Sequence, residues 1–133
     1  MSSTTPEQNK QLVLNAFDTL FNRRDYDAAA SMWSADYIQH STHIAQGRAG
    51  LFERARSLPD LRYENALAVA EGDYVVLYGR FSSNGLPRPM IVANILRIER
   101  RHLVEHWDVV QDEATAEESK SGLPMIGSRF FEK

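Results

Sequence analysis

A histidine and an aspartate stand two positions apart in residues 104–111, where polar and apolar residues alternate as in a strand. Alternation puts His106 and Asp108 on one face, together with Val104 and Val110. Residues two apart on a strand lie about 7 Å apart at Cα, so the imidazole and the carboxylate can share a hydrogen bond directly or through one water. A neighbouring carboxylate raises the pKa of a histidine, so the pair suits proton transfer near neutral pH.

A second interpretation of this segment stays open. His106 and Asp108 would then lie on a solvated face, while Trp107 and Val109 would build the core. A β-bulge would also reverse the alternation, because it inserts one extra residue into a strand. The two valines on the histidine face favour the first interpretation, since they indicate an enclosed and partly polar environment.

One amide interrupts an apolar row in residues 90–100. Asn94 is the polar member of a face whose other members are Met90, Val92, Leu96 and Ile98. A buried amide needs hydrogen-bond partners in the protein or in a ligand. Asn94 is therefore predicted either to make structural hydrogen bonds or to donate one to a developing oxyanion.

Two more histidines lie in and after the short extended segment 37–40. We expect His40, at its end, to enter a pocket and act as a base; the alternative is a surface histidine with satisfied hydrogen bonds. His43 follows in a polar loop, but no third metal ligand is evident nearby. We therefore expect no metal and no other cofactor.

The elements that must position these residues follow from hydrophobic periodicity. Spacings of three and four predict helices at residues 6–21, 25–33 and 47–57, the first of them capped by Thr5 and opened by Pro6. The period then changes to two, which predicts strands at residues 61–71, 74–83, 90–100 and 102–111 joined by short turns.

This order predicts an α+β fold in which three helices pack on one face of a strongly curved antiparallel sheet and enclose a pocket. The 133 residues have room for one domain, spanning 1–133. Residues 112–133 form a C-terminal tail, and we expect its last apolar residues to dock on another surface, which the sequence does not identify.

Composition excludes several classes of function. With 15 basic and 18 acidic residues the net charge is −3, which offers no basic stripe for nucleic acid. No apolar run approaches the roughly 20 residues that cross a membrane, and the start of the chain is polar, so we expect a cytoplasmic protein. Cysteine is absent, and no phosphate-binding loop, HExxH pair or G-x-S-x-G elbow occurs.

The chain also resembles a known family. The resemblance is to the SnoaL-like polyketide cyclase group of the nuclear-transport-factor-2-like (NTF2-like) superfamily, and it rests on the stretches ADYIQHS at residues 35–41, GRAGL at 47–51 and VEHWDVVQ at 104–111. It implies a cone-shaped α+β fold whose pocket holds a small hydrophobic molecule. We expect that molecule to contact Phe17, Trp33, Tyr37, Phe52, Val92 and Val110.

Comparison with the ketosteroid isomerases of the same superfamily implies roles for single residues. His40 takes the place of their general-base carboxylate, and Asn94 that of the carboxylic acid in their oxyanion hole. Phe17 replaces their oxyanion tyrosine, and Gln111 stands where polyketide cyclases tend to carry an acidic residue. The cavity row of their final strand falls on His106, Asp108 and Val110.

The face of the last strand opposite His106 is predicted to carry Leu103, Trp107 and Val109. A second subunit would cover such an apolar face, and a two-fold contact between identical surfaces is the commonest arrangement. We therefore expect a homodimer, in line with the resemblance.

Two hypotheses of function follow. The first is a cofactor-free acid/base enzyme, of isomerase, cyclase or dehydratase type, acting on a small hydrophobic carbonyl, enol or epoxide compound. His40 is then the base, His106 held by Asp108 the acid or second base, and Asn94 a donor to the oxyanion. The second is a non-catalytic small-molecule-binding or dimerisation module.

Overall fold

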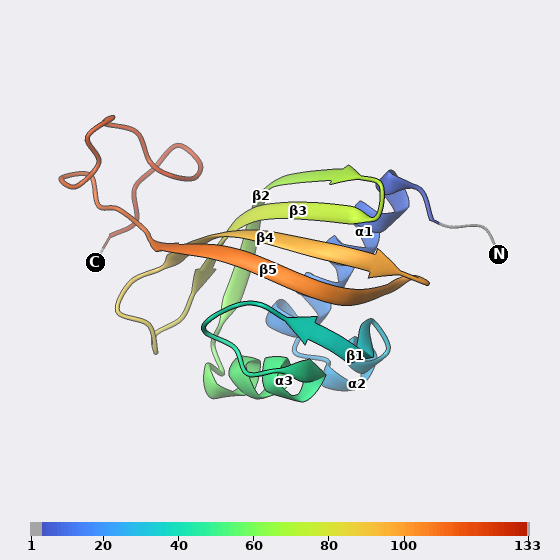
Figure 1. Ribbon diagram of the computed structural model, residues 1–133. Helices are drawn as coiled ribbons and strands as arrows, with labels where there is room; N and C mark the ends of the chain where they lie inside the picture. Colours follow the sequence, from blue (N-terminus) through green and yellow to red (C-terminus); the bar gives the residue numbers. More distant parts are fainter. Residues whose placement is uncertain (1–3, 133) are drawn as a thin grey trace.

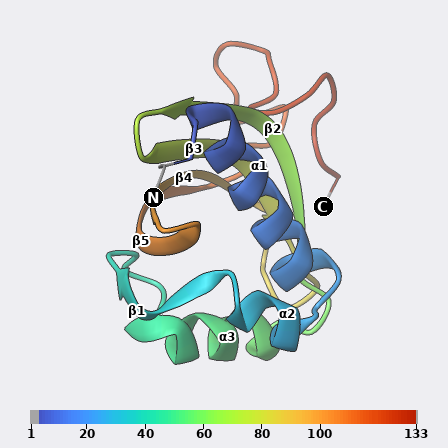
Figure 2. The ribbon, with the colours of Figure 1, turned by 90° about the vertical axis from the view of Figure 1, so that its right-hand side faces the viewer.

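The computed structural model describes residues 4–132, in which helices lie along the concave side of a curved five-stranded sheet (Figures 1 and 2). In chain order the elements are α1 (Pro6–Phe17), a π-helical turn η1 (Asp18–Asn22), α2 (Tyr26–Ala30), β1 (Trp33–Gln39), α3 (Gly47–Ser57), β2 (Arg62–Glu71), β3 (Tyr74–Ser82), β4 (Met90–Glu99) and β5 (His102–Asp112). This arrangement confirms the expected α+β fold. No helix within the described residues is long and apolar enough to cross a membrane.

The first helix begins as its sequence predicts. Gln8 N–H donates to the Thr5 hydroxyl at 3.1 Å while Thr5 N–H donates to the Gln8 side chain at 2.9 Å, a capping box with Pro6 in the first turn. After Phe17 the helix widens into η1. Phe17 and Phe21 both face inward across this turn, and their rings meet edge to face at 5.3 Å.

The second helix is shorter than its sequence predicts. It ends at Ala30, and Trp33, expected on this helix, instead opens β1. The cause is a partner that the local spacing does not reveal: Leu103 N–H donates to Met32 O at 2.9 Å, which starts the pairing of β1 with β5. β1 runs parallel to β5 and extends the predicted segment 37–40 toward its N-terminus.

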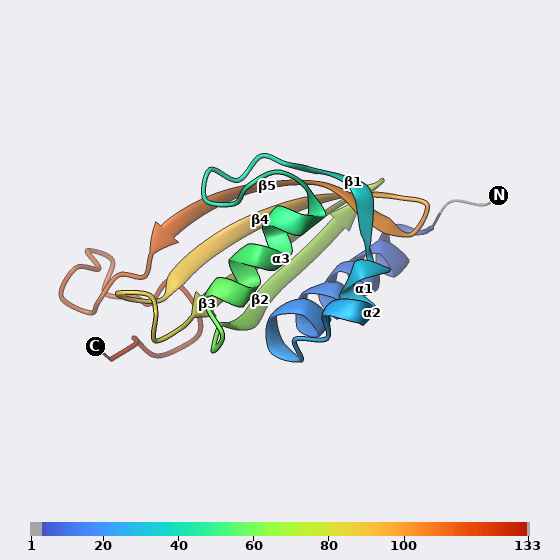
Figure 3. The same ribbon diagram turned by 90° about the horizontal axis from the view of Figure 1, so that it is seen from below.

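The sheet order is β1-β5-β4-β3-β2. The four predicted strands form the expected antiparallel meander from β2 to β5, and β1 adds a parallel strand at one edge. α1 packs on β2 and β3, and α3 packs on β1. Seen from below, both helices lie on the same side of the sheet, so the concave face is covered along two separate lines (Figure 3).

A β-bulge changes one part of the predicted alternation in β5. Arg97 pairs with Glu105 and Ile98 with Leu103, so Val104 is an extra residue between two pairs. Leu103 is therefore buried in the core, at 1% exposure, and the prediction that it lies on the outer face is wrong. Beyond the bulge the predicted alternation holds, because His106 is buried and Val109 is exposed.

The tail packs against the far end of the sheet, as expected for its apolar residues. Tyr78 on β3 donates its hydroxyl hydrogen to Met125 O at 2.9 Å, and Ile126 is buried. Glu113, at 1% exposure, receives two hydrogen bonds of 2.7 Å from Arg80. Charge pairing of this kind compensates the cost of burying the carboxylate.

Candidate functional site

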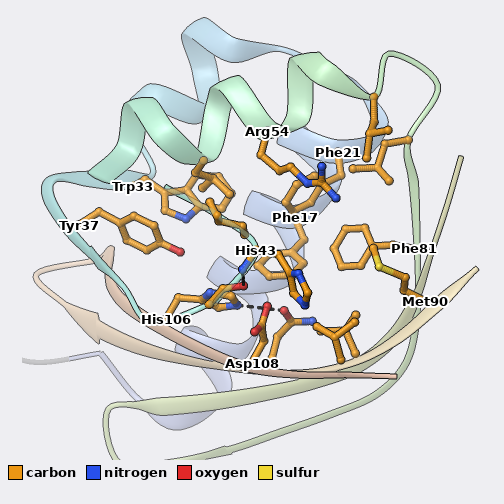
Figure 4. A pocket seen from close by; sticks show the side chains of 18 residues that line it. Phe17, Phe21, Trp33, Tyr37, His43, Arg54, Phe81, Met90, His106 and Asp108 are labelled. Carbon is orange, nitrogen blue, oxygen red and sulfur yellow. Dashed lines mark hydrogen bonds between the residues drawn. The ribbon is translucent and has the colours of Figure 1, made fainter. Parts of the chain in front are cut away.

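A cavity lies between the helices and the concave face of the sheet, and its empty volume is about 650 Å³ with its open mouth included. Most of its wall is aromatic or aliphatic, as in pockets for small organic ligands (Figure 4). Five of the six side chains that we expected to contact a ligand line it, namely Phe17, Trp33, Tyr37, Val92 and Val110. Phe52 does not, because it packs edge-on against Trp33 at 6.2 Å and is buried in the core.

The polar part of the cavity comes from β4 and β5. Asn94 and Asp108 are directly opposite each other in the pairing of these strands, and His106 follows on the same face. All three line the cavity, with Asn94 at 2% and His106 at 4% exposure. The cavity thus brings together three of the four residues that were predicted to converge.

Gln39 lies at the centre of a chain of hydrogen bonds behind this wall. Ser41 N–H donates to Gln39 Oε1 at 2.9 Å, which turns the Gln39 amide nitrogen toward Tyr37; that nitrogen donates to the phenolic oxygen at 3.1 Å. The same Oε1 lies 2.6 Å from His106 Nδ1, so Nδ1 carries a hydrogen and donates it. On the other side of the ring, His106 Nε2 lies 3.0 Å from the side-chain oxygen of Asn94.

The two sides of His106 set its tautomer. A neutral imidazole has one N–H, which Gln39 accepts, so Nε2 is an acceptor that needs a donor. Asn94 Nδ2 is buried without a hydrogen-bond partner among residues 4–132. Turning the Asn94 amide by 180° lets Nδ2 donate to His106 Nε2, and one hydrogen bond then satisfies both groups.

The charge state of His106 differs from the sequence-based expectation. Burial lowers the pKa of His106 from 6.5 to about 4, and the nearby charge of Asp108 opposes this shift without overcoming it. The contacts of His106 are two neutral amides in place of the expected hydrogen bond to Asp108. His106 is thus a neutral, fixed ring, and the prediction of a raised pKa is wrong.

His40 is not in the cavity. Its Nε2 lies 2.7 Å from Glu105 on the outer face of β5, and its ring stacks on Trp107 at 4.9 Å with an interplanar angle of 2°. The reason is strand alternation: Gln39 faces inward, so the next residue faces outward while its N–H donates to His106 O. The prediction that His40 joins the other three residues is wrong.

His43 takes the position that sequence reasoning gave to His40. It lines the cavity, and Figure 4 shows its ring pointing toward the end of the cavity that holds Asp108. Gln46 holds this loop in place, because its amide pairs with both backbone groups of Gln39 at 2.7 and 2.9 Å. Arg54 on α3 also lines the cavity, and neither it nor His43 carried a sequence signal beyond being polar.

The described side chains do not form a cluster of metal ligands. Within residues 4–132, no three His, Asp or Glu side chains are grouped so that they could hold a metal ion. The polar groups of the cavity are one amide, ring nitrogens, hydroxyls, one carboxylate and the guanidinium group of Arg54.

Comparison with known proteins identifies the family. The profile of the SnoaL-like polyketide cyclase family matches residues 11–118, which is most of the chain. The chain belongs to this family. No curated protein matches the SnoaL-like chain significantly.

Solved structures similar to this SnoaL-like chain have the same fold. A proposed ketosteroid isomerase from Kribbella flavida superposes with a TM-score of 0.74 at 17% identity, covering 98% of this chain and 100% of that one. AclR, a proposed hydroxylase from Streptomyces galilaeus, gives 0.67 at 24% identity and covers 81% of both chains. A proposed polyketide cyclase from Acidithiobacillus ferrooxidans gives 0.67 at 19% identity, covering 84% and 92%. The NTF2-like fold is thereby confirmed.

The SnoaL-like cavity here retains part of what the resemblance implied. Phe17 and Asn94 both line the cavity. They are the residues that the resemblance matched to the tyrosine and the carboxylic acid of the oxyanion hole in ketosteroid isomerases. The base expected at His40 is missing from the cavity, whose imidazole and carboxylate side chains are those of His43, His106 and Asp108. Any acid/base chemistry in this cavity must therefore use a different pair of residues from the one predicted.

Proposed function

We propose that this SnoaL-like chain catalyses proton transfer at a carbon next to a carbonyl group in small hydrophobic molecules, without a cofactor. The observation that carries the proposal is the place of Asp108, whose carboxylate lines an otherwise mostly apolar cavity. No residue among 4–132 donates a hydrogen bond to this carboxylate. Its lone pairs are thus open to a proton from a bound molecule.

The chemical step that fits this site is enolisation. Asp108 takes a proton from the carbon next to the carbonyl, and the electron pair of that C–H bond moves into an enolate whose charge rests on oxygen. Return of the proton to another carbon is isomerisation, attack of the enolate carbon on a second carbonyl is cyclisation, and loss of a neighbouring hydroxyl as water is dehydration. All three share the first step, and none requires an oxidant or reductant.

His43 is the proposed second acid/base group. It is exposed at the cavity and points toward the end that holds Asp108, so its ring can exchange protons with both solvent and a bound molecule (Figure 4). The Asn94 amide group has a second hydrogen that His106 does not accept, and this hydrogen serves a polar group of the substrate. His106, neutral and fixed by two amides, is a positioning residue that orients Asn94.

Hydrogen–deuterium exchange tests the proposal without knowledge of the natural substrate. 2-Indanone is a small bicyclic ketone with acidic hydrogens on both carbons next to its carbonyl. We expect the wild-type protein to accelerate deuterium incorporation at these carbons in D₂O, measured by NMR. Asp108→Asn should lose about 10² to 10⁴ of the rate, the usual contribution of a general base.

The matched control is His40→Ala, which removes an imidazole on the other side of the same sheet. It should leave the exchange rate unchanged. If Asp108→Asn exchanges as fast as the wild type, the chain is better described as a binding module, the second function that the sequence allowed.

We also propose that the outer face of the sheet forms a homodimer interface. Two rows of mainly apolar side chains cross β2, β3, β4 and β5 there in register: Leu67, Tyr78, Ala93 and Val109 form one, and Val69, Val76, Ile95 and Trp107 the other. Leu67, Val69 and Val109 are 63%, 60% and 71% exposed in the single chain. Contiguous apolar surface of this kind is typical of a protein–protein contact.

A further inference from the structure

The indole nitrogen of Trp33 is a buried donor without a partner. Trp33 is 1% exposed and lines the cavity, and its Nε1 makes no well-formed hydrogen bond within residues 4–132, although the Tyr37 hydroxyl lies close to it. Buried N–H groups in folded proteins nearly always have an acceptor, and each exception calls for an explanation. An acceptor on a bound molecule would supply one.

The hydroxyl of Tyr37 is a second free donor, and the hydrogen-bond chain behind the cavity is the reason. Ser41 N–H fixes the amide of Gln39, so the Gln39 nitrogen donates to the phenolic oxygen at 3.1 Å. That oxygen is already an acceptor, and its own hydrogen has no acceptor among the described residues. Tyr37 is 4% exposed and lines the cavity.

The two donors lie together. Trp33 and Tyr37 are both on β1, and Figure 4 shows the indole nitrogen and the phenolic hydroxyl turned toward each other at one end of the cavity. Burial raises the pKa of Tyr37 above its usual range, so the hydroxyl keeps its hydrogen at neutral pH. The cavity therefore presents two neutral hydrogen-bond donors side by side on an apolar wall.

We propose that Trp33 Nε1–H and Tyr37 Oη–H form a donor site, which donates hydrogen bonds to the carbonyl oxygen of the substrate and to the enolate oxygen formed from it. This inference rests on the proposed function and names its substrate class: a small apolar molecule with a carbonyl oxygen at one end. Donors placed where negative charge develops stabilise it without reorganisation. A neutral ketone and an enolate both fit, whereas a cation does not.

The test compares two ligands that differ only in the carbonyl group, 2-indanone and indane. Dissociation constants are measured by calorimetry for the wild type, Trp33→Phe, Tyr37→Phe and the double variant. We expect each single change to weaken 2-indanone binding about 3- to 10-fold, the range for one neutral hydrogen bond, and the double variant to weaken it more. Indane binding should change less than about twofold, because phenylalanine preserves most of the apolar wall.

The outcomes separate the two proposals. If the ratio of the dissociation constants of 2-indanone and indane is the same in the wild type and the double variant, the carbonyl binds elsewhere, for example at Asn94, and the donor site is disproved. If the double variant does not fold, the infrared C=O band of bound 2-indanone decides: it should lie at higher frequency in Trp33→Phe and Tyr37→Phe than in the wild type, and equal frequencies disprove the site. Binding is measured at equilibrium, so it stays interpretable even if Asp108 catalyses no exchange.

Discussion

Gln39 Oε1 and His106 Nδ1 lie 2.6 Å apart, and this buried contact between β1 and β5 decides which nitrogen of the ring carries the hydrogen. The amide of Gln39 is itself fixed by Ser41 N–H. A backbone group in the loop after β1 therefore sets the tautomer of a histidine on β5. The polar end of the cavity depends on this link, because the same ring orients Asn94.

Replacing Gln39 by glutamate tests this link. The Gln39→Glu variant places a carboxylate against His106 Nδ1, and the attraction should raise the pKa of His106 by about one unit or more. The measurement is an NMR titration of the imidazole. Gln46→Glu is the control, because Gln46 contacts the backbone of Gln39 and not His106. An unchanged pKa of His106 in Gln39→Glu would contradict the described network.

The low pKa of His106 should also appear in the pH dependence of stability. Its pKa is about 4 in the folded chain and near 6.5 when unfolded, so the unfolded state binds more protons between these values. The stabilisation is complete above pH 6.5 and is lost as the pH falls toward 4. The free energy of unfolding should decrease by up to about 1.4 kcal/mol per pH unit from this group.

Urea unfolding at several pH values measures that decrease. His106→Gln keeps the carboxylates of the chain and removes only this titration, so it should show a weaker pH dependence than the wild type. Parallel curves for both proteins would mean that His106 does not titrate with a lowered pKa.

The pattern of the sequence was sufficient to predict the meander and the polar end of the cavity. Asn94, His106 and Asp108 sit in long strands with unbroken alternation around them, and a period of two determines their face. His40 is misplaced because the sequence predicts only residues 37–40 as extended, and so short a segment does not determine which face each side chain takes. Alternation along the whole of β1 turns Tyr37 and Gln39 inward and His40 outward.

Other errors have causes that no local pattern contains. The bulge at Val104 depends on how β5 pairs with β4, so the sequence of β5 alone does not show that Leu103 faces the core and not the outer face. Phe52 packs against Trp33 in the core and does not line the cavity, and this arrangement depends on packing between elements. The lowered pKa of His106 follows from burial by several elements, which outweighs the neighbouring Asp108.

His40 should matter for stability and not for chemistry. His40→Ala removes a partly exposed ion pair with Glu105 and a stacking contact with Trp107. Pairs of this exposure contribute between zero and about 1 kcal/mol, so the free energy of unfolding should fall by about that amount. Denaturant unfolding measures it. A loss of several kcal/mol would show that the contact is more important than its exposure indicates.

The proposed dimer predicts a solution mass of twice the 15.1 kDa of one chain. Val109→Glu places a charge at the β5 end of the first apolar row and should yield monomers, as measured by light scattering at micromolar concentration. Leu123→Glu is the control, since Leu123 is equally exposed, at 68%, but lies in the tail. A monomeric wild type would refute the proposed interface.

Asp108 is the proposed base that removes a proton from a carbon next to a carbonyl inside this cavity, and deuterium incorporation into 2-indanone measures this step. We expect rapid exchange with the wild type and with His40→Ala, and a rate about 10² to 10⁴ lower with Asp108→Asn at unchanged thermal stability. Equal exchange rates for the wild type and Asp108→Asn would contradict it.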